Sequence, residues 1–339
     1  MKPFDARRRL GFGRMDRILG AFLGMVGIWY GMVGCGQKTS PLTIAVIPKS
    51  MGEDFWGTVE QGARAAAADL GVQIEWQGPL TETDHAAQNS ILENMVSRGV
   101  QGVAIAPLDR KASRKPVENA VRAGVPVVVF DSELDSDAYV SFVATNNEQG
   151  GRLGAEHLAK LLGGKGRVMC MRFVQGTGST EARAKGFLEA AQAAGLTVLA
   201  HPHAEDATVA GCKKTALNTL ESLVKQGRLE LDGIFACNDR STMGVLEALQ
   251  DLAKSGVQIQ VRFVGFDFTP RLIEALQKDQ IQALVVQNPY KMGYMAVEVL
   301  VKHLRGEKVE KFYDTGVQVV TKQRLQEPEI RKLVGLKET

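Results

Sequence analysis

The sequence predicts an α/β protein built from two similar domains, each with a doubly wound parallel sheet. Short runs of β-branched and aliphatic residues alternate with helical patterns of about ten to fifteen residues. The alternation runs through residues 42–144 and then begins again, and polar residues follow most of the apolar runs. At 339 residues, the chain is long enough for two domains of ordinary size.

The first apolar run, residues 42–47, sets the pattern. Its continuous aliphatic character predicts a strand that is buried on both faces of a parallel sheet. A polar turn, residues 48–54, separates it from an alanine-rich helix, 57–70, which Gly71 ends. Ligands of open α/β sheets bind outside the carboxyl ends of the strands. The turn is therefore a candidate binding loop; alternatively, it is an ordinary connection whose aromatic residues pack under the helix.

The rest of the first domain repeats this unit. The predicted strands are 72–76, 102–106, 126–130 and 139–144, and the predicted helices are 84–98 and 111–123. Right-handed crossovers place the loops that follow the strands at one edge of the sheet. Those loops carry Lys49, Asp109 and Asp131.

The second domain restates the first. Its predicted helices are 149–162, 181–194, 208–226, 241–253 and 270–278, and its predicted strands are 167–171, 196–200, 233–237, 260–266 and 281–286. A helix over 290–305 and one strand-like run over 311–321 close the chain. Thr269 stands directly before Pro270, where it is expected to cap the helix. Short connections between two domains favour hinge closure over a cleft.

The first 34 residues have the features of an export signal. Six Lys and Arg residues lie among residues 1–17, and an apolar run over 18–33 follows. The sequence Met32-Val33-Gly34-Cys35 resembles the lipobox of bacterial lipoproteins. It predicts a lipoprotein signal peptide over 1–34, acylation of Cys35, a tether over 35–41, and an exported protein at the periplasm or cell surface. An uncleaved membrane anchor is the alternative.

Composition and motifs limit the possible functions. Without residues 1–34 the chain has 35 Lys and Arg against 36 Asp and Glu, so we expect no nucleic-acid partner. The remaining cysteines, Cys170, Cys212 and Cys237, have no metal-type spacing, and we expect no disulfide framework. Cys170 and Cys237 lie in apolar runs and are interpreted as buried small hydrophobes. The common catalytic and phosphate-binding motifs are missing from the sequence. We expect neither an enzyme nor a cofactor or metal.

Several separated pieces of sequence together carry a family likeness. They are IAVIPKSMGEDFW, VVVFDSE, STEARAKGF, FACNDRSTMGVLEAL, FVGFDFTP and VVQNPYKMGY. Over residues 43–321 the chain resembles the ribose- and galactose-type periplasmic binding proteins, the sugar-capture subunits of bacterial ABC importers, and the related effector domains of LacI-type repressors. The resemblance implies two lobes joined by a three-segment hinge, with residues 42–145 and 288–316 in one lobe and residues 146–287 and 317–339 in the other.

The resemblance also implies a binding site. Phe55 and Trp56 would sandwich the ligand ring, Asp131 would accept hydrogen bonds from sugar hydroxyls, and Arg183 would donate to them. The polar shell would be completed by Asn238, Asp267 and Gln287. Hydroxyl groups both donate and accept, so carboxylates, amides and guanidinium groups suit them. Aromatic faces suit the apolar side of the ring.

The chain departs from the ribose-type pattern at four site positions. Lys49 stands in place of a serine, Glu53 and Ala106 in place of asparagines, and Ser132 in place of an arginine. The IPK and FDSE segments instead resemble the autoinducer-2-binding branch, in which that lysine reaches the ligand. Lys49 and Glu53 are therefore candidate ligand-binding residues. The expected ligand is a sugar or sugar-like polyol, and Lys49 allows an anionic or strongly polar substituent.

Structural alternatives remain for several of these residues. Lys49 and Glu53 could pair with each other on the rim, and Arg183 could be an exposed surface charge. Asn238 could serve only as a helix cap, and one of the two aromatic residues could lie in the core. The first connection between the lobes, Asn146 and Asn147, is interpreted as hinge.

These observations predict a lipid-anchored solute-binding protein of an ABC importer. It would act as a monomer, close around a sugar-like ligand and deliver that ligand to a membrane permease. The alternative function is a ligand-sensing receptor module for a sensor kinase or chemoreceptor.

Overall fold

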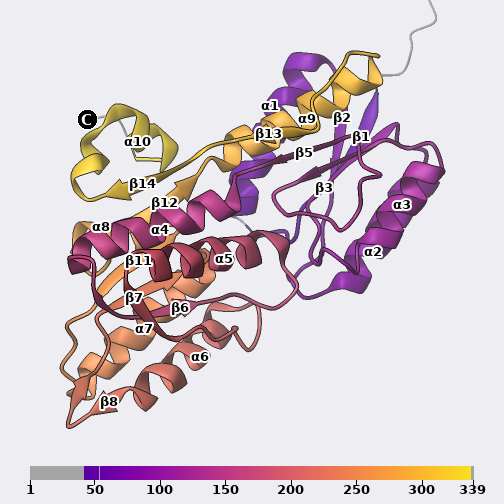
Figure 1. The fold of residues 1–339 in the computed structure, drawn as a ribbon. Helices are drawn as coiled ribbons and strands as arrows, with labels where there is room; N and C mark the ends of the chain where they lie inside the picture. Colours follow the sequence, from indigo (N-terminus) through magenta and orange to yellow (C-terminus); the bar gives the residue numbers. More distant parts are fainter. Residues whose placement is uncertain (1–41, 53, 337–339) are drawn as a thin grey trace, which may run out of the picture. The chain divides into compact units, whose positions relative to one another are not determined.

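The computed structural model describes residues 42–52 and 54–336, which form two α/β lobes (Figure 1). The predicted signal peptide, the acylated Cys35, the tether and Glu53 lie outside the described residues. Each lobe is organised around a six-stranded sheet. The predicted fold class is therefore confirmed.

The sheet of the first lobe has the strand order β13-β5-β4-β3-β1-β2, and all of its pairs are parallel. Its strands are β1 (Thr43–Ile47), β2 (Gln73–Trp76), β3 (Gly102–Ile105), β4 (Val127–Phe130), β5 (Ser141–Ala144) and β13 (Phe312–Asp314). Its helices are α1 (Phe55–Leu70), α2 (His85–Ser97), α3 (Arg114–Arg122) and α9 (Pro289–Leu304). Strands β3 and β4 are buried along their whole length, as expected for a sheet covered by helices on both faces.

The sheet of the second lobe has the order β14-β12-β11-β10-β6-β7, in which only β14 is antiparallel to its neighbour. Its strands are β6 (Gly166–Met171), β7 (Leu196–Ala200), β10 (Gly233–Ala236), β11 (Arg262–Phe266), β12 (Ala283–Gln287) and β14 (Val317–Thr321). Its helices are α4 (Asn147–Leu162), α5 (Gly178–Ala193), α6 (Val209–Ser222), α7 (Asp239–Lys254), α8 (Pro270–Gln277), the 3₁₀ helix η1 (Gln323–Gln326) and α10 (Pro328–Leu333).

Two predicted elements were wrong. The helix expected over 208–226 ends at Ser222, and a hairpin of β8 (Val224–Lys225) and β9 (Arg228–Leu229) follows. Gln226 and Gly227 both have positive φ, 50° and 75°, which is the backbone of a tight hairpin turn. The single strand expected over 311–321 is instead two strands, β13 and β14, which belong to different sheets.

The two lobes use the same helix packing. In the second lobe a Cβ on Gly151 of α4 would lie 1.9 Å from the carbonyl oxygen of Arg183, and one on Gly186 of α5 would lie 2.0 Å from that of Glu148. In the first lobe α1 and α9 cross in the same way, at Gly62 and Gly293. Glycine is required where backbones approach this closely. The α4–α5 crossing fixes Arg183 against the start of α4.

The chain passes between the sheets at three places within the described residues. They are the connections from β5 to α4, from β12 to α9 and from β13 to β14. In Figure 1 the gold α9 and β13 accordingly lie with the indigo and purple elements of the first lobe. The Thr145 hydroxyl joins the three connections, with Oγ1 2.9 Å from Oε1 of Gln287 and 3.2 Å from Oγ1 of Thr315.

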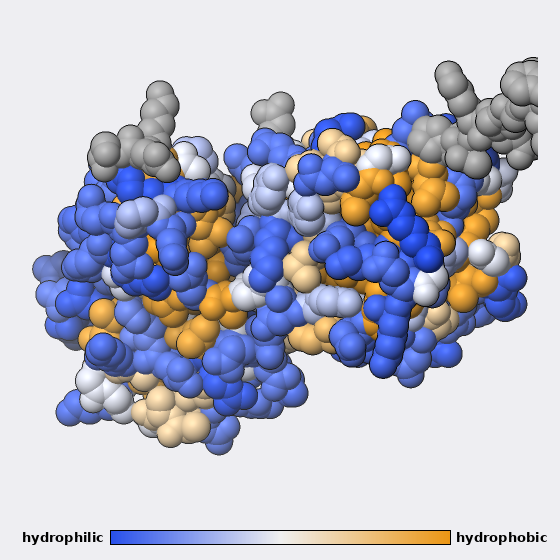
Figure 2. All heavy atoms as spheres, turned by 90° about the horizontal axis from the view of Figure 1, so that it is seen from above, coloured by the Kyte–Doolittle hydropathy of each residue, from blue (hydrophilic) through white to orange (hydrophobic). Residues whose placement is uncertain are grey.

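The outer surface is mixed in character. Figure 2 shows one face, on which hydrophilic residues cover most of the area and apolar residues are exposed in smaller groups. Among the described residues, the exposed large apolar side chains are Met51, Leu80, Leu199, Tyr290 and Phe312. Across residues 42–52 and 54–336, every helix is too short or too polar to cross a membrane.

Candidate ligand-binding site between the lobes

A cavity of about 420 Å³ lies between the lobes where the carboxyl ends of the strands converge. It is lined by every predicted site residue that the structure describes: Lys49, Phe55, Trp56, Asp131, Arg183, Asn238, Asp267 and Gln287. Glu53 is the remaining predicted residue, and it lies outside the described residues. Residues that are far apart in the sequence, such as Arg183 and Asp267, therefore share one cavity.

The two lobes contribute equivalent aspartates. Asp131 directly follows β4 and Asp267 directly follows β11, and both have left-handed backbones, with φ of 62° and 64°. The amide of Asp131 donates to the Val143 carbonyl on β5 (3.1 Å), and that of Asp267 donates to the Val285 carbonyl on β12 (2.8 Å). Aspartate tolerates this strained conformation better than most residues do. Such strain is typical of functional sites.

Asp131 is tightly paired within its own lobe. Nζ of Lys49 lies 2.6 Å from Oδ2 of Asp131, and only about 4–5% of either side chain is exposed. The same ammonium group donates to Oγ of Ser132 at 2.5 Å. Lys49 is thus a buried partner of the site carboxylate.

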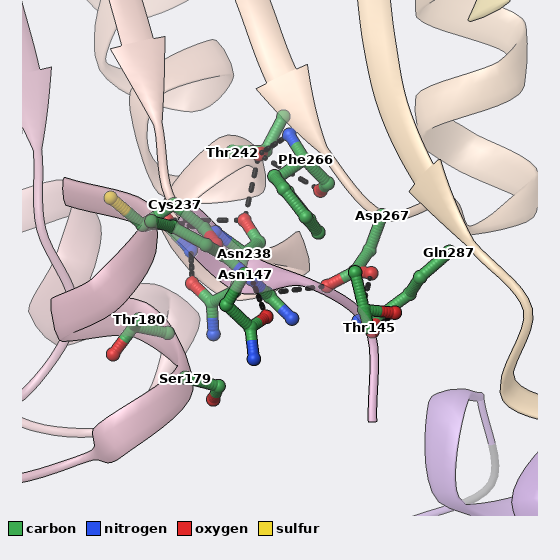
Figure 3. Close-up of polar contacts among 12 residues, drawn as sticks. Thr145, Asn147, Ser179, Thr180, Cys237, Asn238, Thr242, Phe266, Asp267 and Gln287 are labelled. Atoms are coloured by element: carbon green, nitrogen blue, oxygen red, sulfur yellow. Dashed lines mark hydrogen bonds and ion pairs between the residues drawn. The ribbon is translucent and has the colours of Figure 1, made fainter. Parts of the chain in front are cut away.

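Asp267 is held more loosely. Nε2 of Gln287 donates to its Oδ1 at 2.7 Å, whereas Nη1 of Arg183 lies 3.6 Å from its Oδ2. Figure 3 shows Asp267 and Gln287 at the ends of neighbouring strands, with Thr145 beside them. Burial raises the pKa of the Asp267 carboxyl, and the charge of Arg183 and the hydrogen bond from Gln287 only partly oppose this.

Arg183 is buried and fixed on several sides, so it is not an exposed surface charge. Its Nε donates to Oδ1 of Asn147 (2.9 Å), its Nη1 donates to the Cys237 carbonyl (3.0 Å), and its guanidinium group lies 3.8 Å from the centre of the Phe266 ring. Asn147 also donates from Nδ2 to the carbonyl of Asp131 at 3.3 Å. The interpretation of Asn147 as hinge alone was therefore incomplete, because its side chain orients Arg183.

Asn238 has both of the roles considered for it. Its Oδ1 accepts from the amide of Ser241 (3.0 Å) and so caps α7, and its side chain also lines the cavity. Thr269 caps α8 as predicted, since its Oγ1 accepts from the amide of Leu272 (3.2 Å). Asp267 consequently faces the cavity and does not cap that helix.

The two aromatic residues differ in burial, although both line the cavity. Their rings pack edge to face, with centroids 5.0 Å apart. Trp56 is 5% exposed, packs against Phe130 in the core of its lobe and donates from Nε1 to Oε1 of Glu82 at 2.9 Å. Phe55 is less buried. This matches the interpretation that one of the pair belongs to the core.

The sequence analysis missed five charged residues of the cavity: Asp54, Glu82, Asp239, Arg240 and Arg271. Glu82 of the first lobe and Arg240 of the second form an ion pair across the cavity at 3.5 Å. Burial, together with the charge of Asp267, raises the pKa of Asp239 to about 7. Asp239 and Arg240 directly follow Asn238 at a strand end, a signal that was available; Glu82 lies in a loop without any motif.

Nothing in the described part of the chain has the geometry of a metal centre. No group of three His, Cys, Asp or Glu residues there could hold an ion. The three cysteines are buried and unbridged, and burial was predicted for Cys170 and Cys237. The site is therefore made of paired charges, amides, hydroxyls and two aromatic rings, which suits the binding of a polar ligand.

Comparisons with known proteins agree with this geometry. A family model described as a periplasmic binding protein domain matches residues 44–308. The ribose import binding protein of Escherichia coli K12 is 29% identical over 281 residues, covering 83% of this chain and 91% of that protein.

Two solved structures are similar along nearly their whole length. A carbohydrate transporter solute-binding protein from Agrobacterium radiobacter, in complex with D-arabinose, has a TM-score of 0.81 and 34% identity, covering 87% of this chain and 99% of that one. An ABC transporter solute-binding protein from Agrobacterium vitis, with bound D-fucose, has a TM-score of 0.79 and 35% identity, covering 86% and 99%. The matched family domain, the shared fold and the strand-end cavity show that the chain belongs to the periplasmic binding protein family.

Proposed function

We propose that the protein captures an uncharged sugar or sugar-like polyol between its lobes and delivers it to the permease of an ABC importer. One observation carries the proposal: the equivalent aspartates of the two lobes, Asp131 and Asp267, line one cavity together with Phe55 and Trp56. The carboxylates can accept hydrogen bonds from the hydroxyl groups of a sugar, and the aromatic rings can cover its apolar C–H face. The names of the relatives, which mention ribose import, D-arabinose and D-fucose, support the same ligand class.

Each polar residue has a chemical role in this proposal. The Asp267 carboxylate accepts hydrogen bonds from ligand hydroxyls, and Arg183 donates to their oxygens. The amides of Asn238 and Gln287 can do either. Phe55 and Trp56 cover the apolar C–H face of the ring.

The charge balance of the cavity favours a neutral ligand. Each lining cation has a carboxylate partner: Lys49 with Asp131, Arg183 with Asp267, Arg240 with Glu82 and Arg271 with Glu247. An anionic ligand would enter a buried site in which the described cations are already paired, and it would lose its hydration without gaining a new counter-ion. We therefore propose an uncharged ligand rather than one with an anionic substituent facing Lys49.

Hinge closure is the mechanism we infer. The lobes, residues 42–145 with 288–316 and residues 146–287 with 317–336, would move as two bodies about the three connections that meet at Thr145. A ligand that contacts both lobes stabilises the closed state only by the contacts it gains there. Two consecutive hydrogen bonds, from Gln287 to Asp267 and from Thr145 to Gln287, link the proposed ligand site to the three connections between the lobes.

We further propose export and lipid anchoring through Cys35, on the evidence of the lipobox-like sequence. Cells that express the full chain are labelled with an alkyne-tagged fatty acid, and the expected result is label on the protein and its recovery with membranes. Cys35→Ser should lose the label. Labelling that persists in Cys35→Ser would contradict acylation at this residue.

A ligand screen tests the proposed function. Thermal unfolding is followed with D-ribose, D-arabinose, D-fucose, D-allose and several polyols, and with D-galacturonate as a charged control. At least one neutral sugar should raise the unfolding temperature and bind 1:1 by calorimetry. A shift with D-galacturonate alone, or with none of the compounds, contradicts the proposal. Deleting the gene would distinguish an importer subunit from a receptor, because only the loss of an importer subunit should abolish sugar uptake.

A further inference from the structure

Helix α5, which carries Arg183, lacks a cap of its own. The residue before it, Thr177, makes no side-chain hydrogen bond to the first turn. The neighbouring helices α4, α6, α7 and α8 of the same lobe are all capped by the side chain that precedes them. A missing cap leaves first-turn amides without a partner in the helix.

A residue of the other lobe supplies the bond. The amide of Ser179, in the first turn of α5, donates to Oγ of Ser132 at 3.2 Å. The two serine hydroxyls also lie 2.8 Å apart. Ser132 follows β4 in the first lobe, and both serines are buried, with 0% and 3% exposed.

The Ser132 hydroxyl uses all of its hydrogen-bonding capacity in this position. Its two lone pairs accept from Nζ of Lys49 and from the amide of Ser179, which leaves one hydrogen to donate. That hydrogen can go to Oδ2 of Asp131 (3.2 Å) or to Oγ of Ser179 (2.8 Å). The cap is thus oriented by the same buried ion pair that forms the ligand site of the first lobe.

The backbone around α5 is built for close approach of the lobes. Gly176 has a φ of 92°, and a Cβ there would lie 2.1 Å from Oδ2 of Asp109 in the first lobe. A Cβ on Gly178 would lie 3.1 Å from the backbone of Glu133. The amide of Arg110 also donates to the Gly176 carbonyl at 3.3 Å. The start of α5 therefore contacts the first lobe over several residues.

We propose that Ser132 is an interlobe helix cap, which forms when the lobes close and completes the first turn of α5. Opening would break this bond and expose the amide of Ser179. Ser132 would consequently be a positioning residue: it would not touch the ligand but would stabilise the closed state and hold the helix that presents Arg183. The effect on affinity rests on the proposed function, whereas the cap itself does not.

The test compares Ser132→Ala with Ser136→Ala in the full chain. Ser136 lies in the same loop, but its hydroxyl bonds to Glu118 within the first lobe. Ser132→Ala should weaken binding of D-arabinose, or of whichever neutral sugar the screen selects, by about fivefold, the size of a typical cap. Ser136→Ala should leave the affinity within about twofold of the parent. Equal affinity in Ser132→Ala and the parent would overturn the proposal.

Amide hydrogen exchange tests the cap by a readout other than affinity. Exchange over residues 175–185 should be faster in Ser132→Ala than in Ser136→Ala when sugar holds the lobes closed, and the difference should shrink without sugar, because opening breaks the bond. Ser179→Ala keeps the amide that is capped, so its exchange should stay close to that of the parent. Unchanged exchange in Ser132→Ala would overturn the cap. If Ser132→Ala also unfolds at a lower temperature, Ser132→Thr, which keeps Oγ, should restore slow exchange, and its failure to do so would overturn the cap as well.

Discussion

Asp131 and Asp267 occupy equivalent places in the two lobes, yet their surroundings differ. Both follow a central strand, both have a left-handed backbone, and both line the same cavity. Asp131 has an ammonium group at 2.6 Å from its own lobe. Asp267 has the guanidinium group of Arg183 at 3.6 Å, and that group donates its shorter hydrogen bonds to Asn147 and to the Cys237 carbonyl.

A single carboxylate cannot be both stably buried and fully open to a ligand, and the two aspartates differ in which of these they favour. A carboxylate that is closely paired is stable when buried but has fewer lone pairs for a ligand. A carboxylate that is loosely paired is costly to bury, which the raised pKa of Asp267 reflects, and its oxygens remain open to hydroxyl groups. We therefore infer that the first lobe provides a fixed frame and that, in the proposed function, the second lobe provides the stronger acceptor for a ligand.

Breaking the tight pair should have the largest effect. Lys49→Met leaves Asp131 buried and unpaired, and we expect the free energy of unfolding to fall by about 3–5 kcal/mol. Urea unfolding measures this. Adding Asp131→Asn to Lys49→Met removes the orphaned charge and should recover most of the loss. A double variant no more stable than Lys49→Met would show that the ion pair is not what the lysine contributes.

Replacing the equivalent aspartate of the second lobe by asparagine should weaken ligand binding without destabilising the fold. Asp267→Asn keeps Oδ1 as an acceptor for Gln287 but removes the charge, and we expect sugar affinity to fall by about thirtyfold, or about 2 kcal/mol. Because burial raises the pKa of Asp267, the unfolding temperature should stay the same or rise. Calorimetric titration and thermal unfolding measure the two quantities. Retained affinity would remove Asp267 from the site.

The last expected effect, confined to one range of pH, is a pH dependence in the second lobe. Asp239 has a pKa of about 7 when folded, against an ordinary value of 3.8. Between these values the folded protein binds a proton that the unfolded chain does not, so this group lowers stability as pH rises through that range. Asp239→Asn should therefore gain stability relative to the parent at pH 8 but not at pH 4. Chemical unfolding at both pH values measures the gain; an equal difference at the two would contradict the assignment.

Local sequence patterns were sufficient for much of the fold. The continuous apolar runs at β3, β4 and β10 predicted buried parallel strands because a strand covered on both faces needs no polar alternation. The pattern failed at residues 226–227 and 315–316, where a turn interrupts an otherwise regular run. Turn geometry there depends on one or two residues, and Gly227 and Gly316 supplied only a weak signal.

The sequence by itself determined that the side chains directly after the central strands, such as Asp131 and Asp267, reach the cavity, because the carboxyl ends of parallel strands lie at the same edge of a sheet. The tertiary structure decided the partners. Lys49 with Asp131, Ser132 with Ser179 and Glu82 with Arg240 each join residues far apart in the chain. Such pairs depend on how two sheets and two lobes approach each other, and no local pattern of hydrophobicity or spacing encodes that approach.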